Sequence, residues 1–316
     1  MRNTKYEIRF TNLKRRLRIF AVLCAVCVFS TINSFAQDNV LTLPQEQIDW
    51  AAASSFLSRA IANGTIEQKR DALIQIRNLE TAEASRIAVP ALKDNSEVVR
   101  ATAAASIVFL PADEAVPLLV SLLADKKPFV KREAAYALGT IGNPMAINLL
   151  LRVLQKDKVM EVRSAAVAAL GAIGDASVIS ELVKILQRKL QAKEEFIRRA
   201  AARSIGQIAQ TIQTGERQII TPENFLPAHA KSIKQPKFSR IVEAFPQFQP
   251  AILTLIQTLS NPQEAADVKR EAAFALGAIG DESAIAVLQQ SAAAADYYLA
   301  EISRESLQKI AIAASR

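Results

Sequence analysis

Cysteine and histidine are scarce in this 316-residue sequence, which holds two cysteines and one histidine. Both cysteines, Cys24 and Cys27, lie near the N-terminus, and the histidine is His229. A lone histidine supplies one metal ligand, whereas structural zinc takes four from Cys, His or carboxylate groups. The sequence therefore predicts no metal site and no structural disulfide after residue 36, and we expect His229 to lie in a solvated loop.

Motifs for catalysis or cofactor binding are also lacking. We find no glycine-rich phosphate loop, no nucleophile elbow and no histidine-glutamate metal motif. Asp94, Asp125 and Asp157 recur at nearly equal spacing, which favours roles in turns over paired-carboxylate catalysis. The sequence therefore predicts no catalytic residue and no cofactor, and a protein that is not an enzyme.

The first 36 residues have the pattern of a secretory signal peptide. A basic segment (1–18) precedes an apolar run (19–29) and the small-x-small triplet Ser34-Phe35-Ala36. The apolar run is shorter than the roughly 20 residues of a membrane-spanning helix. We expect cleavage near Ala36, no stable membrane span in the mature chain and a periplasmic or secreted protein, with an uncleaved N-terminal anchor as the alternative.

Removing this segment also removes most of the net charge. The full chain carries a formal charge of +8, with 39 Lys and Arg against 31 Asp and Glu. Seven of the basic residues and one acidic residue lie before residue 37, which leaves 32 against 30. A nearly neutral chain has no overall attraction to nucleic acid, so we expect no such partner.

One motif recurs along the chain. An aliphatic residue and a cation precede an alanine-rich stretch in residues 99–107, 130–143, 162–175, 197–208 and 268–281. The leading aliphatic residues are 31, 32, 35 and 71 positions apart, and the last interval holds one repeat plus an insertion. Diverged copies of the motif begin near Gln68 and Ile302. A fixed period of this length predicts a repeat architecture.

Each copy predicts two helices joined by a tight turn. Alanine favours the first helix, which ends at a glycine such as Gly142, Gly174 or Gly280, where a left-handed cap is least unfavourable. One hairpin cannot bury its own apolar face, so the copies must stack. The expected fold is an all-α solenoid of about six to seven hairpins. We expect a cap helix over 37–64 and repeats over 65–316, with an insertion at about 210–249.

The pattern V-(R/K)-x-x-A-A-x-A-L-G-x-I-G-(D/N), as in residues 130–143 and 268–281, resembles HEAT repeats. It is most similar to the short HEAT-like type named after phycobilisome lyases, and the resemblance covers about 65–316. It implies an α-solenoid. The same repeat type occurs in lyases, regulatory subunits and adaptors, so it leaves the function open.

The cation after each leading aliphatic residue is a candidate functional position. These cations are Arg100, Lys131, Arg163, Arg198 and Lys269. We interpret them as a structural ladder, in which each cation meets a carboxylate or helix end of an adjacent repeat. The alternative is a basic stripe that binds an acidic partner.

The predicted function is a protein-binding scaffold or adaptor that acts through an extended surface. Candidate partner-binding residues in the second helices, expected on the inner side of the curve, are Asn148, Arg152, Glu181 and Lys184. Candidates in the insertion are Lys231, Lys234, Lys237 and Arg240. Two alternatives stay open, namely a phycobilin-lyase-like enzyme or its accessory subunit, and a self-associating component of the cell envelope.

Overall fold

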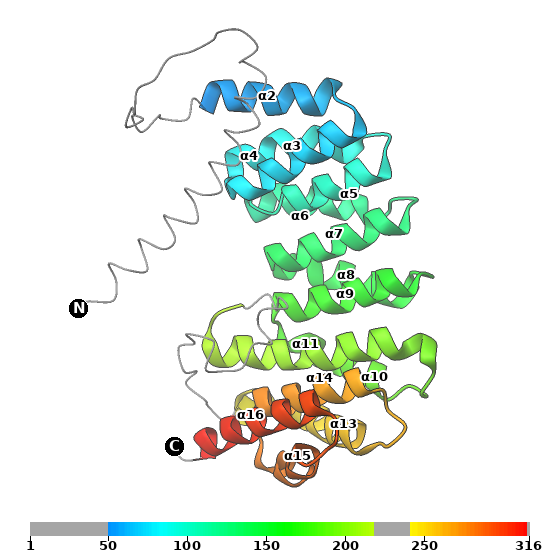
Figure 1. The fold of residues 1–316 in the computed structure, drawn as a ribbon, viewed down its shortest axis with the longest axis vertical. Helices are drawn as coiled ribbons and strands as arrows, with labels where there is room; N and C mark the ends of the chain where they lie inside the picture. The colour runs from blue at the N-terminus through cyan, green and yellow to red at the C-terminus, as the bar shows by residue number, and fades with distance from the viewer. Residues whose placement is uncertain (1–49, 218–240, 315–316) are drawn as a thin grey trace, which may run out of the picture. The chain divides into compact units, whose positions relative to one another are not determined.

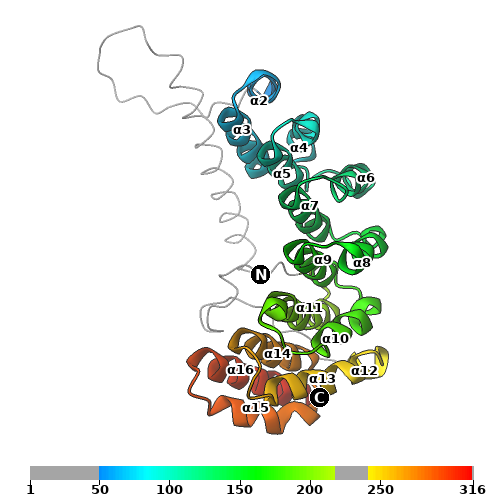
Figure 2. The same cartoon turned by 90° about the vertical axis from the view of Figure 1, so that its right-hand side faces the viewer.

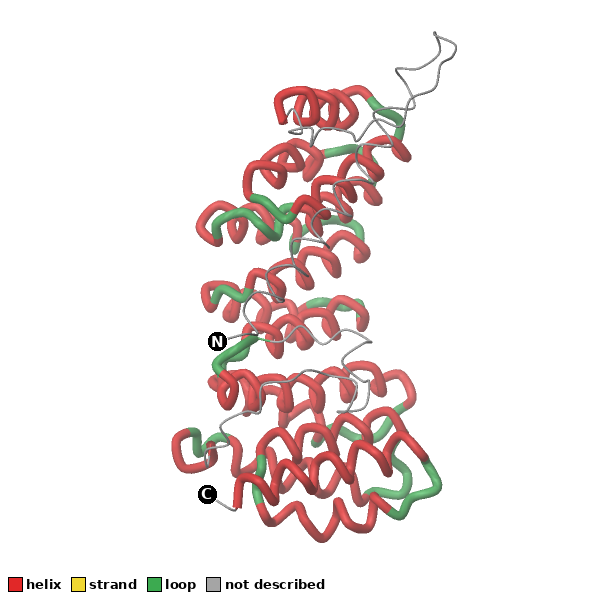
Figure 3. The backbone as a smooth tube through the Cα atoms, turned by 60° about the vertical axis from the view of Figure 1, so that its left-hand side comes forward, coloured by secondary structure: helices red, strands yellow, loops and turns green. Residues whose placement is uncertain are grey.

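The computed structural model describes residues 50–217 and 241–314. No residue in these ranges lies in a strand, and helices follow one another throughout (Figures 1 and 3). This confirms the predicted all-α fold of stacked hairpins. No helix within the described ranges is long and apolar enough to cross a membrane. The predicted signal peptide, residues 37–49 and His229 lie outside the described residues.

The chain divides into two compact units, residues 1–111 and 112–316. The described helices of the first unit are α2 (Trp50–Asn63), α3 (Ile66–Leu79), α4 (Ala82–Ala88), the 3₁₀ turn η1 (Val89–Lys93) and α5 (Glu97–Ser106). Buried serines join them: Ser106 Oγ donates to Leu73 O at 2.9 Å, and Ser85 Oγ donates to Ser106 O at 2.8 Å. These bonds hold α3 and α4 against α5.

The second unit holds most of the repeats. Its helices are α6 (Ala112–Leu122), α7 (Pro128–Ile141), α8 (Ile147–Lys156), α9 (Met160–Ile173), α10 (Ile179–Leu186), α11 (Glu195–Thr214), α12 (Ile241–Ala244), α13 (Phe248–Ser260), α14 (Ala266–Ile279), α15 (Ile285–Ala292) and α16 (Tyr297–Ala314). Short 3₁₀ turns precede four of them: η2 (Pro144–Ala146), η3 (Ala176–Val178), η4 (Ala192–Glu194) and η7 (Glu282–Ala284). The alternation of a long and a short helix repeats the sequence period.

These helices form two rows. The first row is α7, α9, α11, α14 and α16, in which each helix packs on the next, and the second row is α8, α10, α13 and α15. Within this unit, Figure 2 shows the first row on the inner side of the bend and the second row on the outer side. The expectation that the second helices line the inner side is therefore wrong.

Glycines explain why the first row takes the inner side. A Cβ atom at Gly139 would lie 2.7 Å from Ala169 Cα, one at Gly171 would lie 2.7 Å from Ser204 Cα, and one at Gly277 would lie 2.6 Å from Ser306 Cα. The first-row helices thus touch backbone to backbone. The more closely spaced row must lie on the inside of a bend, and bulkier leucines and isoleucines space the second row.

The last turns of α11 depart from the sequence expectation. This helix has 20 residues where α7, α9 and α14 have 14, so the segment between α11 and α13 begins at residue 215 and not near 210. Gln213 Nε2 donates to Ala278 O at 2.8 Å, and Arg217 Nη1 donates to Ile141 O at 2.8 Å. These bonds satisfy carbonyl groups at the ends of α14 and α7, which stabilises the extension.

Candidate interaction surface

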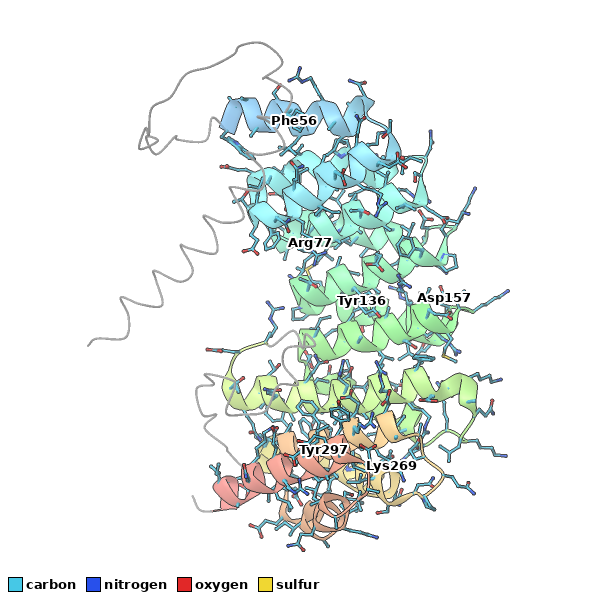
Figure 4. All side chains as sticks on the ribbon, viewed as in Figure 1. Phe56, Arg77, Tyr136, Asp157, Lys269 and Tyr297 are labelled. Atoms are coloured by element: carbon cyan, nitrogen blue, oxygen red, sulfur yellow. The ribbon has the colours of Figure 1, made fainter. Side chains whose placement is uncertain are left out.

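The exposed aromatic side chains that the structure describes in the second unit all lie on the first row. They are Phe129 and Tyr136 on α7, Phe196 on α11, and Tyr297 and Tyr298 on α16, with exposed fractions between 37 % and 69 %. Among residues 112–217 and 241–314, no second-row helix exposes an aromatic side chain. Figure 4 looks onto the first row and labels Tyr136 and Tyr297 there.

Three of these aromatics occupy one repeat position, directly before the leading aliphatic residue. Ser306 of α16 contacts Gly277 as Ser204 of α11 contacts Gly171. Ser204 stands seven residues after the leading Ile197, so the leading residue of the last copy is Leu299, seven residues before Ser306, and not Ile302. From α7 to α16 this position holds Phe129, Glu161, Phe196, Asp267 and Tyr298. Packed helices lie about 8–10 Å apart, so an aromatic ring recurs about every 16–20 Å.

Cationic side chains lie over two of these rings. Arg132 Cζ lies 4.9 Å from the centroid of Phe129, and Arg270 Cζ lies 5.4 Å from that of Tyr298. Each such contact contributes about 0.5–1 kcal/mol at an exposed site. We call the surface formed by Phe129, Arg132, Tyr136, Phe196, Arg199, Arg203, Arg270 and Tyr298 the first-row face.

The arginines of the first-row face on α11 and α14 are paired within the protein. Arg199 Nη1 lies 3.0 Å from Asp267, Arg203 Nη2 lies 2.8 Å from Glu271, and Arg270 Nη2 lies 2.7 Å from Asp296. Burial raises the pKa of the Glu271 carboxyl, against the opposing effect of Arg203. Internal pairing leaves this part of the face with little excess charge beside its exposed rings.

The Arg270–Asp296 pair makes stability depend on pH. Hydrogen bonds from Arg270 lower the pKa of Asp296 below its ordinary value of 3.8. Stability from this group is therefore complete above 3.8 and is lost as the pH falls through the lower folded-state pKa. Urea unfolding at pH 7 and pH 3 should show a smaller loss of stability on acidification in Asp296→Asn than in the wild type. Equal losses would contradict this assignment.

The ladder cations occupy different environments. Lys131 pairs with Asp157, and the buried Arg198 pairs with Glu264. Arg100 Nη1 donates to Asp94 O at 2.8 Å. Lys269 has no carboxylate partner among the described residues. Its neighbour Arg270 pairs with Asp296. Figure 4 labels Asp157 and Lys269.

Arg163 differs from the other ladder cations. Its Nη2 donates to Met160 Sδ at 3.4 Å, and its Nε is buried without a hydrogen-bond partner. Within the described residues no carboxylate pairs with it. Arg163 on α9 is therefore a ladder cation without a carboxylate partner, and we call such a position an open rung.

The predicted partner-binding residues do not lie on the first-row face. Asn148 and Arg152 are exposed on α8, and Glu181 pairs with Lys184 at 2.6 Å on α10, all on the second row. The insertion candidates Lys231, Lys234, Lys237 and Arg240 lie outside the described residues. The sequence analysis did not identify these aromatic residues, although two of them, Phe129 and Phe196, stand directly before leading aliphatic residues that the sequence does identify.

No group of three or more His, Cys, Asp or Glu side chains within the described ranges could hold a metal ion. The ionisable side chains of the first-row face instead meet in pairs of opposite charge. The chemistry that the described surface offers is aromatic contact and hydrogen bonding by arginine.

Comparison with protein families identifies the repeats. A family model for HEAT repeats matches residues 85–171. A model for the PBS lyase HEAT-like repeat matches residues 162–188 and 268–293. The matched segments include α7, α9 and α14, whose glycine positions form close contacts of the first row.

Curated relatives include deoxyhypusine hydroxylases. The chain is 34% identical over 116 residues to that of Danio rerio, covering 36% of this chain and 37% of the relative. It is 34% identical over 99 residues to that of Arabidopsis thaliana, covering 31% and 32%. The chain thus spans about a third of the length of the curated relatives it matches.

The chain is also similar to solved structures. Human deoxyhypusine hydroxylase in complex with glycerol is 18% identical with a TM-score of 0.36, over 83% of this chain and 96% of that one. The complex of CpcE and CpcF of phycocyanin lyase from Nostoc sp. PCC7120 is 17% identical with a TM-score of 0.44, over 90% and 99%.

The expectation that the protein is not an enzyme is wrong, because the curated relatives it matches are named for a hydroxylase. The expectation relied on the absence of catalytic motifs, which are groups of residues close together in sequence. A repeat fold brings together residues about 30 positions apart on successive helices. A search for local motifs does not detect such an arrangement.

Proposed function

Since this chain is a HEAT-repeat protein, we propose that it binds a segment of a partner protein along the first-row face. The observation that carries the proposal is the gathering of exposed aromatics on one of two rows. Tyrosine, phenylalanine and arginine are enriched in the cores of protein interfaces, and truncating a hot-spot residue there weakens binding by about 2 kcal/mol or more. The partner segment presents apolar side chains spaced to meet rings about 16–20 Å apart.

Photocrosslinking tests this proposal and identifies the partner in the same experiment. A benzophenone side chain at Tyr136, Phe196 or Tyr298 should trap the same partner segment, and mapped crosslinks should advance along it from α7 to α16. Met145 and Leu253 are exposed on the second-row side and provide matched apolar control positions. Replacing any one of these three aromatic residues with alanine should weaken binding of the partner at least about tenfold. Equal capture from both rows would contradict the proposal.

A hydroxylase-type reaction is the second candidate, and the 34% identity to deoxyhypusine hydroxylase favours it. In this case the bound segment would be a deoxyhypusine-containing protein substrate. Incubation of such a protein with the full chain, dioxygen, an electron donor and a panel of divalent metal ions should add one oxygen atom, detected as a mass gain by mass spectrometry. Unchanged substrate mass would reject this candidate and leave the binding proposal standing.

The predicted signal peptide directs the search for the partner. Residues 1–36 carry the pattern of an exported protein. Crosslinking should therefore begin in the cell-envelope and secreted fractions.

A further inference from the structure

Among the described residues, Arg163 is an open rung of the cation ladder. In the closed rungs a cation of a first helix meets a carboxylate in the turn that leads to the next first helix. These closed rungs are Lys69–Asp94, Lys131–Asp157 and Arg198–Glu264. Because three repeats bind a carboxylate at this position, the repeat geometry itself selects that chemical group.

The sequence explains why the rung at Arg163 is open. Asp94 and Asp157 each stand five residues before a leading aliphatic residue, Val99 and Val162. Ala192 stands five residues before Ile197, so the turn after α10 lacks the acid at this position. The turn keeps one carboxylate, Glu194, and its Oε2 lies 3.8 Å from Arg188 Nη1.

Arg163 has hydrogen-bonding capacity that an incoming anion can fill. Its Nε is buried and has no hydrogen-bond partner, and its Nη2 meets only the weak acceptor Met160 Sδ at 3.4 Å. The turn carries Arg188, Lys189 and Lys193 against the single Glu194, and residues 187–193 are exposed. A buried guanidinium N–H without an acceptor is unfavourable, and a carboxylate is the acceptor that matches its geometry.

We propose that Arg163 binds a carboxylate supplied by another molecule, which completes the ladder at α9. The ligand class is a carboxylate side chain, Asp or Glu, on a peptide. The site uses the ladder edge and not the aromatic rings, so it stands independently of the proposed function. If both proposals hold, the partner segment carries an acidic residue.

A titration with sodium acetate, followed through the ¹⁵N–¹H signals of the arginine Nε groups, tests the site. The Arg163 signal, identified by its loss in Arg163→Lys, should shift and saturate, whereas sodium chloride at equal ionic strength should leave it in place. A peptide of six glutamates should saturate the same signal at lower concentration. An Arg163 signal that does not move with acetate overturns the proposal. Equal saturation by sulfate overturns the assignment to carboxylates.

An internal acid provides the second test. Ala192→Asp should close the rung, abolish the acetate-dependent shift and raise the Tm by about 2–4 °C or more, whereas Ala192→Asn should leave the Tm and the titration unchanged. Acetate titrations that agree in the wild type and Ala192→Asp contradict the proposal. Glu194→Gln should leave the Arg163 signal unchanged without ligand. A shift there would mean that Glu194 already fills the rung, and would overturn the proposal.

Discussion

Replacing Glu264 with alanine should lower the free energy of unfolding by about 3–5 kcal/mol, the range for breaking a buried ion pair from one side. The side chains of Arg198 and Glu264 are 4% and 2% exposed, so the change leaves an arginine buried without its counter-charge. Arg198 keeps its hydrogen bonds to the carbonyls of Leu186 and Arg188, at 2.5 Å and 3.0 Å, and these do not neutralise it. Urea unfolding followed by circular dichroism measures the loss.

Two further variants isolate the cause. Arg198→Met with Glu264→Ala should be more stable than Glu264→Ala alone, because no charge is then left buried unpaired. Glu181→Ala breaks the Lys184–Glu181 pair, in which the lysine side chain is 64% exposed, and should change stability by at most about 1 kcal/mol. A loss in Glu264→Ala as small as in Glu181→Ala would contradict the structural role of the pair.

Replacing Gly171 with valine should destabilise the second unit by about 3 kcal/mol or more. A Cβ atom there would lie 2.4 Å from Ser204 Oγ and 2.7 Å from Ser204 Cα, so α9 and α11 would have to separate. The buried hydrogen bond from Ser204 Oγ to Val167 O, 3.0 Å long, would also be strained. The midpoint of urea unfolding reports the effect.

Valine at Ala168 is the matched control, since it adds the same side chain to the same helix at a partly exposed position. It should cost less than about 1 kcal/mol, the difference in helix propensity. Adding Ser204→Gly to Gly171→Ala should recover part of the stability lost in Gly171→Ala. Similar losses in Gly171→Val and Ala168→Val would show that close helix contact is not the cause.

Much of the fold could be predicted from local sequence features. The alanine stretch and the glycine of each copy predict a helix and its end, and Gly142, Gly174 and Gly280 have φ values of +67°, +84° and +80°. The period predicts stacking, and the all-α fold is confirmed. The length of α11 could not be predicted, because Gln213 stabilises its last turns through carbonyls 65 residues away.

The candidate surface was harder to predict than the fold. Helical spacing places Phe129, Phe196 and Tyr298 at one repeat position, but only the packing of α14 on α16 identifies Leu299 as the reference residue of the last copy. Glu264 could not be assigned to Arg198, since the segment between α11 and α13 separates them by 66 residues. The sequence holds no local catalytic motif that would have predicted the enzyme class of the curated relatives.

By itself the sequence determined the helical hairpin, the glycines that end its first helix and the requirement that hairpins stack to bury their apolar faces. These features depend on residues within about one repeat of each other. The tertiary structure alone decided that the glycine-bearing row lies inside the bend, that the exposed aromatics share that row, and that the ladder lacks an acid at Arg163. The reason is physical: such features depend on distances between helices about 30 residues apart, and these distances are set by side-chain volume at each helix contact.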